Sequence, residues 1–105
     1  MKRRLSANQR DTLFVLALFK VKNVTAYVAL SKVKAMLEQS RSQELDPANY
    51  RKGMHLLAKR GLIEMVREHD LSLSMRLTEL GLIDAEKIFQ EKTGQELAVS
   101  SVQTD

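Results

Sequence analysis

The chain has 105 residues, which is enough for one domain with a single core and too few for two. Hydrophobic residues make up 44% and charged residues 29%, a balance that excludes wholesale disorder, and the absence of cysteine excludes disulfides and thiolate-bound metals. The longest unbroken apolar run, Leu13 to Phe19, is too short to span a bilayer, and no signal-peptide cleavage pattern follows the basic start. We therefore expect a cytoplasmic protein.

Positive charge is concentrated in the first part of the chain. Residues 1–60 carry thirteen Lys and Arg against four acids, a net charge of +9. Residues 61–105 carry four Lys and Arg against nine acids, a net charge of −5. This separation favours a polyanionic partner for the first part of the chain.

The first predicted helix follows a short basic arm at residues 1–5. Ser6 and Gln9 have the spacing of a capping box, which predicts a helix over about residues 7–20. Its apolar residues cover almost the whole circumference, so we expect this helix to be central and mostly buried.

A second helix is predicted over about residues 26–39, with Thr25 as its cap. Its apolar stripe consists of Val28, Ala29, Val33, Met36 and Leu37. A polar connection, SRSQELD, leads from this helix to the next one.

The third predicted helix has the clearest boundaries. Asp46 is a strong N-cap, Pro47 suits the first helical position, and Gly61 stands where a left-handed residue ends a helix. The residues spaced to face the core are Tyr50, Met54, Leu57 and Ala58.

A β-hairpin and a closing helix complete the predicted domain. Two strands at residues 62–67 and 71–77 are joined near residues 68–70. Alternation in the second strand puts Leu71, Leu73, Met75 and Leu77 on one face and Ser72, Ser74 and Arg76 on the other. The last helix covers about residues 78–93 and ends at Gly94, and residues 96–105 are expected to be a disordered tail.

Three helices, a hairpin and a closing helix form the element order of a winged helix-turn-helix domain, which we assign to residues 6–95. The fold class is therefore mainly α with a small β-hairpin wing. Two stretches, MHLLAKRGLIE and RLTELGLIDAEKI, resemble the PadR and MarR families of bacterial transcription regulators. The matching residues are Leu57 and Gly61-Leu62-Ile63 in the first stretch, and Leu77, Thr78 and Gly81 in the second. The resemblance covers about residues 12–92 and implies a DNA-binding winged helix. The long link before the third helix is more similar to PadR-like proteins. The wing is short and lacks the Asp-x-Arg tip of MarR proteins.

The third helix carries the predicted DNA-reading face. Its outward side chains are rich in hydrogen-bond donors, and no acid follows Asp46 on the helix. Arg and Lys suit guanine and phosphate, and Asn can bond adenine at two atoms. We expect helix 46–60 to enter the major groove of double-stranded DNA, with contacts from Asn49, Arg51, Lys52, His55 and Lys59. The plain alternative is a basic, solvated helix.

Phosphate contacts are expected from the arm, the second helix and the wing. The candidate residues are Lys2, Arg3, Arg4, Lys32, Lys34, Arg67 and Arg76. The arm can equally contribute only charge. Glu64, Glu68 and Asp70 beside the two wing arginines weaken the case for the wing.

The last helix offers more apolar surface than a small core absorbs, namely Leu80, Ile83, Ile88 and Phe89. One helix face recognises little sequence, and two-fold symmetric partners reading successive half-sites are the usual solution. We therefore expect a homodimer through these residues. The alternative is that the helix packs only across the first helix of its own chain.

No nucleophile motif, glycine-rich phosphate loop or pair of catalytic carboxylates is present, so we do not expect an enzyme. His55 and His69 lack further ligands at metal-site spacing, so we expect neither a metal nor a cofactor. The leading hypothesis is a dimeric transcription regulator, a repressor rather than an activator. The alternatives are a winged-helix protein-interaction module in a larger assembly, and a plasmid or phage DNA-maintenance or replication-control protein.

Overall fold

The computed structural model describes residues 4–22 and 26–94. The elements of this part are α1 (Ala7–Val21), β1 (Val28–Ala29), α2 (Leu30–Arg41), α3 (Pro47–Lys59), β2 (Ile63–Arg67), β3 (Leu73–Leu77) and α4 (Glu79–Thr93). Lys2, Arg3, the expected cap Thr25 and the expected tail at 96–105 lie outside the described residues. Among the helices of the described part, none is long and apolar enough to cross a membrane.

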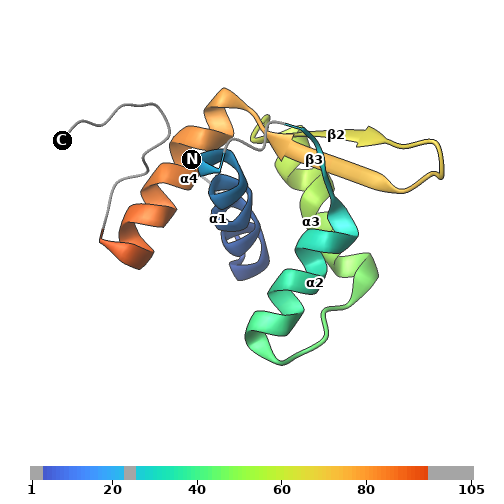
Figure 1. Cartoon of the computed structure of the whole chain (residues 1–105), viewed down its shortest axis with the longest axis horizontal. Helices are drawn as coiled ribbons and strands as arrows, with labels where there is room; N and C mark the ends of the chain where they lie inside the picture. The colour runs from blue at the N-terminus through green and yellow to red at the C-terminus, as the bar shows by residue number, and fades with distance from the viewer. Residues whose placement is uncertain (1–3, 23–25, 95–105) are drawn as a thin grey trace.

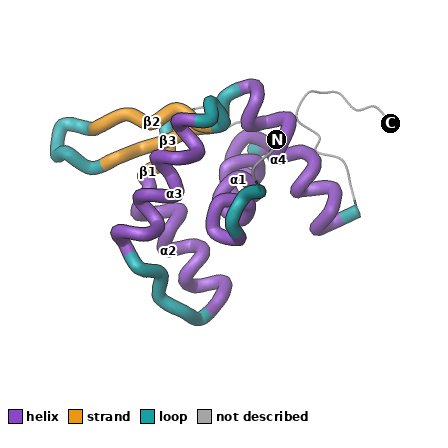
Figure 2. The backbone as a smooth tube through the Cα atoms, turned by 180° about the vertical axis from the view of Figure 1, so that it is seen from behind, coloured by secondary structure: helices purple, strands orange, loops and turns teal. Residues whose placement is uncertain are grey.

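Helix α1 lies between α4 on one side and the pair α2 and α3 on the other (Figure 1). The view from behind shows the same order, with the β2–β3 hairpin projecting away from the helices (Figure 2). The strands form one antiparallel sheet in the order β1-β3-β2, in which Ile63 pairs with Leu77 and Val28 pairs with Met75.

The starts of α1 and α3 are those that the sequence predicts. The Ser6 hydroxyl accepts a hydrogen bond from the Gln9 amide at 3.1 Å, and Gln9 Oε1 accepts one from the Ser6 amide at 2.9 Å, which confirms the capping box. Asp46 Oδ2 accepts from the Asn49 amide at 2.8 Å and caps α3. Gly61, with φ 81°, follows the end of α3 in the left-handed region, also as predicted.

The prediction of a helix from residue 26 is wrong at its start. Residues Val28 and Ala29 form β1, and α2 begins only at Leu30. Val28 is 7% exposed, and it is β-branched, so it suits a strand that pairs with the open edge of β3. This long-range pairing overrides the local helical pattern, and it adds a third strand to the predicted two-stranded hairpin.

The alternation predicted for residues 71–77 fails at two positions. Leu71 lies in the hairpin turn, with φ 72° and 69% of its surface exposed. Ser74 is 5% exposed although it was expected to face outward, because β3 is the central strand and its neighbours shield this small side chain.

Each element contributes to one core. The most deeply buried side chains include Leu13 and Ala17 of α1, Val33 of α2, Tyr50, Met54 and Leu57 of α3, Met75 of β3 and Ala85 of α4. The predicted core face of α3 is therefore confirmed for Tyr50, Met54 and Leu57, and its opposite face is turned to solvent.

Backbone contacts join the end of α3 to the start of α4. The Thr78 hydroxyl donates to Gly61 O at 2.6 Å and accepts from the Gly81 amide at 2.9 Å, and the Thr78 amide donates to Leu62 O at 3.2 Å. A Cβ on Gly81 would lie 1.8 Å from Leu62 O. The glycine-leucine pair after α3 and the LT-x-x-G pattern before α4 are thus two halves of one junction, which requires glycine at position 81.

Candidate nucleic-acid interface

The five side chains predicted to read DNA all lie on the solvent face of α3. Asn49, Arg51, Lys52, His55 and Lys59 are exposed. Tyr50, Met54 and Leu57, which lie on the opposite face, are at most 1% exposed. Because an α-helix advances by about 100° per residue, this division leaves the five polar side chains on one continuous face.

The face is electropositive and rich in donors. Within the described residues, none of the five side chains takes part in an ion pair. The nearby carboxylate of Asp46 is turned to the α3 backbone as its N-cap. Arginine, lysine and asparagine side chains in this state can bond base edges and phosphates without first leaving an acidic partner.

Two polar contacts that the sequence reasoning missed connect α3 to α1. Gln9 Nε2 donates to Gly53 O at 3.1 Å, and the hydroxyls of Thr12 and Tyr50 lie 2.8 Å apart. Burial raises the pKa of Tyr50 to about 12, although the hydrogen bond to Thr12 and the charge of Arg41 act in the other direction. The available signal was the presence of Gln and Thr on the otherwise apolar side of α1.

The predicted phosphate contacts differ in their local partners. Lys34 forms an ion pair with Glu38 at 2.7 Å, and Glu38 also accepts from the Leu45 amide at 2.9 Å, so this pair holds the connection that leads into α3. The hydrogen bond from Lys34 and that from Leu45 lower the pKa of Glu38. Lys32 and Arg4 are exposed, and Lys32 lies 5.5 Å from the Phe19 ring centroid.

Both wing arginines are engaged within the chain. Arg76 forms an ion pair with Glu64 at 2.8 Å, and its guanidinium lies 4.5 Å from the ring centroid of Tyr27, whose hydroxyl donates to the same carboxylate. Arg67 donates to Leu71 O at 2.9 Å in the wing turn. Either arginine would have to leave these partners to reach a phosphate.

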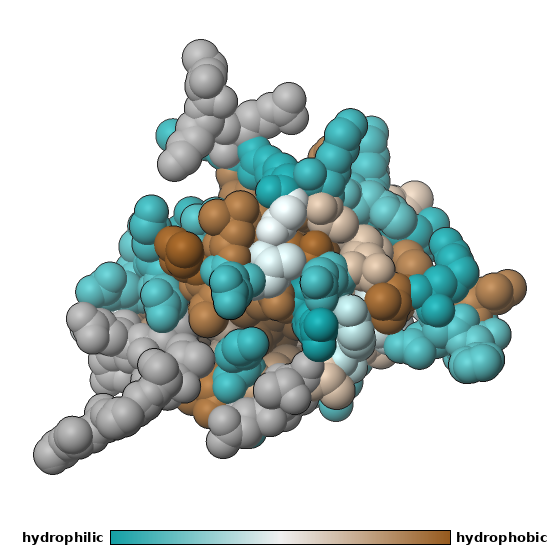
Figure 3. Space-filling view, turned by 90° about the horizontal axis from the view of Figure 1, so that it is seen from above, coloured by the Kyte–Doolittle hydropathy of each residue, from teal (hydrophilic) through white to brown (hydrophobic). Residues whose placement is uncertain are grey.

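The four residues expected at a dimer contact divide into two pairs. Leu80 and Ile83 are each 52% exposed. Ile88 is 3% exposed in the core, and Phe89 stacks on Phe14 with 5.6 Å between ring centroids, so the expectation that these two face a partner needs correction. Ile88 and Phe89 lie about a third of a turn or more from Ile83 around α4, on the side that packs against α1. From above, hydrophobic surface is visible in the middle of the molecule between hydrophilic rims (Figure 3).

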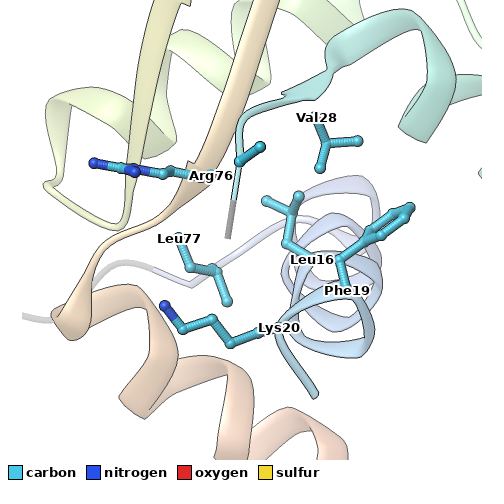
Figure 4. A pocket seen from close by; sticks show the side chains of 7 residues that line it. Leu16, Phe19, Lys20, Val28, Arg76 and Leu77 are labelled. Atoms are coloured by element: carbon cyan, nitrogen blue, oxygen red, sulfur yellow. The ribbon is translucent and has the colours of Figure 1, made fainter. Parts of the chain in front are cut away.

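A small pocket lies between α1, β1 and β3. Leu16 and Phe19 line it from α1, and Val28 and Leu77 line it from the strands (Figure 4). Its volume is about 20 Å³, which is close to the space of one water molecule. It is therefore too small for an effector molecule. Across the described ranges 4–22 and 26–94, no group of three His, Asp or Glu is arranged to hold a metal ion.

No protein-family model and no curated protein matches the chain. Among solved structures, RosR from H. salinarum is similar with a TM-score of 0.67 and 22% identity, over 86% of this chain and 78% of that chain. Two point mutants of Lactococcus lactis ZitR are similar with TM-scores of 0.62 and 0.61, each at 22% identity over 89% of this chain. The chain spans 57% of the length of ZitR. The common fold is a winged helix-turn-helix, which confirms the predicted fold class.

Proposed function

We propose that this chain is a sequence-specific protein that binds double-stranded DNA and regulates transcription, with α3 inserted into the major groove. The observation that carries the proposal is the exposed, donor-rich face of α3, which has no ion-paired acid among the described residues. In helix-turn-helix folds the corresponding helix contacts base edges in the major groove. Asn49, Arg51, Lys52 and His55 are the proposed base and groove contacts, and Lys59 and Lys32 are proposed phosphate contacts.

The proposed active form is a homodimer, as recognition of two half-sites requires. Leu80 and Ile83 are its proposed contact, because both are half exposed on the solvent side of α4. Repression is the proposed mode, since a dimer that covers its site blocks other proteins from it and needs no further surface. The proposed affiliation is with PadR-like or MarR-like regulators, supported by the junction of Gly61, Thr78 and Gly81.

The test is binding to random-sequence duplex DNA, followed by fluorescence anisotropy at two salt concentrations. Wild type is compared with the double variant Arg51→Ala/Lys52→Ala and with the charge-matched control Lys22→Ala/Lys87→Ala, whose side chains are exposed elsewhere. We expect affinity that falls as salt rises, is lost in the α3 variant and is retained in the control. Equal losses in both variants would show that net charge, not α3, is responsible for binding.

A second candidate function is that of a protein-interaction module. Leu71 at the wing tip is 69% exposed, and Arg67 and Arg76 of the wing are engaged within the chain, so the wing, all of which is described, offers an apolar side chain but no unengaged arginine to a partner. Absence of DNA binding by the folded wild type at low salt would favour this second function.

A further inference from the structure

Two hydrogen bonds join α1 to α3, and the residues that form them have the same spacing on both helices. Gln9 Nε2 donates to Gly53 O, and the Thr12 and Tyr50 hydroxyls share a second bond. Gln9 and Thr12 stand three residues apart on α1, and Tyr50 and Gly53 stand three residues apart on α3. The two bonds are therefore separated by about one helical turn on each helix, and they pair the helices in antiparallel order. We call these two bonds the register clamp.

Apolar packing between two helices favours contact but specifies position weakly, because it is not directional. Hydrogen bonds depend steeply on distance and angle. The groups of the register clamp are shielded from water, since Thr12 is 0%, Tyr50 1% and Gln9 7% exposed. Sliding or rotation of α3 on α1 would leave buried polar groups without partners, which is strongly unfavourable. The register clamp therefore selects one position of α3.

We propose that Gln9, Thr12 and Tyr50 are positioning residues that fix α3 on α1 and thereby determine how well the protein discriminates between DNA sequences. This inference rests on the proposed function. Tyr50 is the direct neighbour of Asn49 and Arg51, so a change in its position moves both side chains. Contacts that read bases must be held to about 0.5 Å, whereas a lysine or arginine on a phosphate tolerates larger shifts.

Gln9 offers a way to separate the capping box from the register clamp. Its Oε1 accepts from the Ser6 amide in the capping box, and its Nε2 donates to Gly53 O. A glutamate serves the capping box equally well but has no donor for Gly53 O. Gln9→Glu therefore keeps the cap and removes the Gln9–Gly53 bond of the register clamp, whereas Ser6→Ala breaks the cap and keeps both bonds of the register clamp.

The DNA used in the test is the best duplex that wild type selects from a random library, together with a scrambled duplex of equal length and composition. The readout is the ratio of the two affinities and the dependence of each on salt. In Gln9→Glu we expect the ratio to fall about ten-fold while the salt dependence on scrambled DNA stays unchanged. In Ser6→Ala we expect lower thermal stability and an unchanged ratio. An unchanged ratio in Gln9→Glu would overturn the inference, whereas failure of wild type to enrich any sequence would overturn the proposed function instead.

A second measurement tests the register clamp without DNA. The chain has no cysteine, so spin labels can be placed at two introduced cysteines, Ala7→Cys on α1 and Leu56→Cys on α3, both at exposed positions. We expect one narrow distance distribution in the otherwise unchanged chain and in Ser6→Ala. Gln9→Glu should broaden or displace the distribution. An identical narrow distribution in all three chains would show that the Gln9–Gly53 bond does not set the position of α3.

Discussion

Replacing Gly81 by alanine tests the junction between α3 and α4. The added Cβ would lie 1.8 Å from Leu62 O and 2.8 Å from Leu62 C, and both atoms belong to the backbone, so no flexible side chain can give way. Helix α4 must therefore move away from Leu62. That movement breaks the hydrogen bonds from the Thr78 amide to Leu62 O and from the Thr78 hydroxyl to Gly61 O, which now measure 3.2 Å and 2.6 Å.

The expected loss is large for a domain of this size. Two hydrogen bonds contribute about 1 kcal/mol each, and overpacking adds about 1–3 kcal/mol. The higher helix propensity of alanine offsets somewhat less than about 1 kcal/mol of this loss. Gly81→Ala should therefore lower the free energy of unfolding by about 2–4 kcal/mol, measured by urea denaturation followed by circular dichroism.

Gly53→Ala is the matched control, because it is the same substitution in another helix. A Cβ on Gly53 would lie 3.8 Å from Gln9 Cγ, an ordinary van der Waals distance. This variant should gain about 0.5–1 kcal/mol from helix preference. If Gly81→Ala is as stable as wild type, the account of the junction is refuted; if both variants lose stability equally, steric contact with Leu62 is not the reason.

Three further predictions follow from burial and charge. Burial raises the pKa of Tyr50 to about 12, so the folded state favours the neutral phenol. The free energy of unfolding should therefore fall by about 2 kcal/mol as the pH rises from 10 to 12. Tyr50→Phe should remove this pH dependence in alkaline denaturation. Leu71 has φ 72°, a left-handed conformation that destabilises a leucine by about 1 kcal/mol and that asparagine adopts more readily. Leu71→Asn should therefore raise the melting temperature, and an unchanged or lower value would contradict this. Lysine at both Leu80 and Ile83 should leave the fold intact and yield monomers in sedimentation, whereas Ile88→Lys should unfold the chain. A wild-type chain that is monomeric at high concentration would contradict the proposed dimer.

The sequence predicts those features that depend on neighbours along the chain. Ser6 with Gln9, and Asp46 with Pro47, locate helix starts through bonds that span three residues, and these predictions are confirmed. The spacing of Tyr50, Met54 and Leu57 identifies the core side of α3, and the exposed face is the side opposite to it. The candidate site could therefore be predicted before any tertiary contact was known.

Features that depend on distant partners could not be predicted in this way. β1 exists because Val28 pairs with Met75, and local helical spacing does not contain that information. The contact of Arg76 with the Tyr27 ring depends on the same pairing, because β1 brings Tyr27 beside the sheet. The register clamp likewise requires α1 and α3 to be packed together before Gln9 has a partner.

Whether α3 is the DNA-binding face can be tested by titrating the isotope-labelled chain with the selected duplex and following the amide chemical shifts. We expect the largest changes in α3, over residues 47–59, and at Lys32, while the amides of α4 change little. We also expect Arg51→Ala to remove the changes in α3 without altering the spectrum of the free protein elsewhere. Changes centred on the wing tip or on α4, with α3 unaffected, would contradict the claim that α3 is the DNA-binding face.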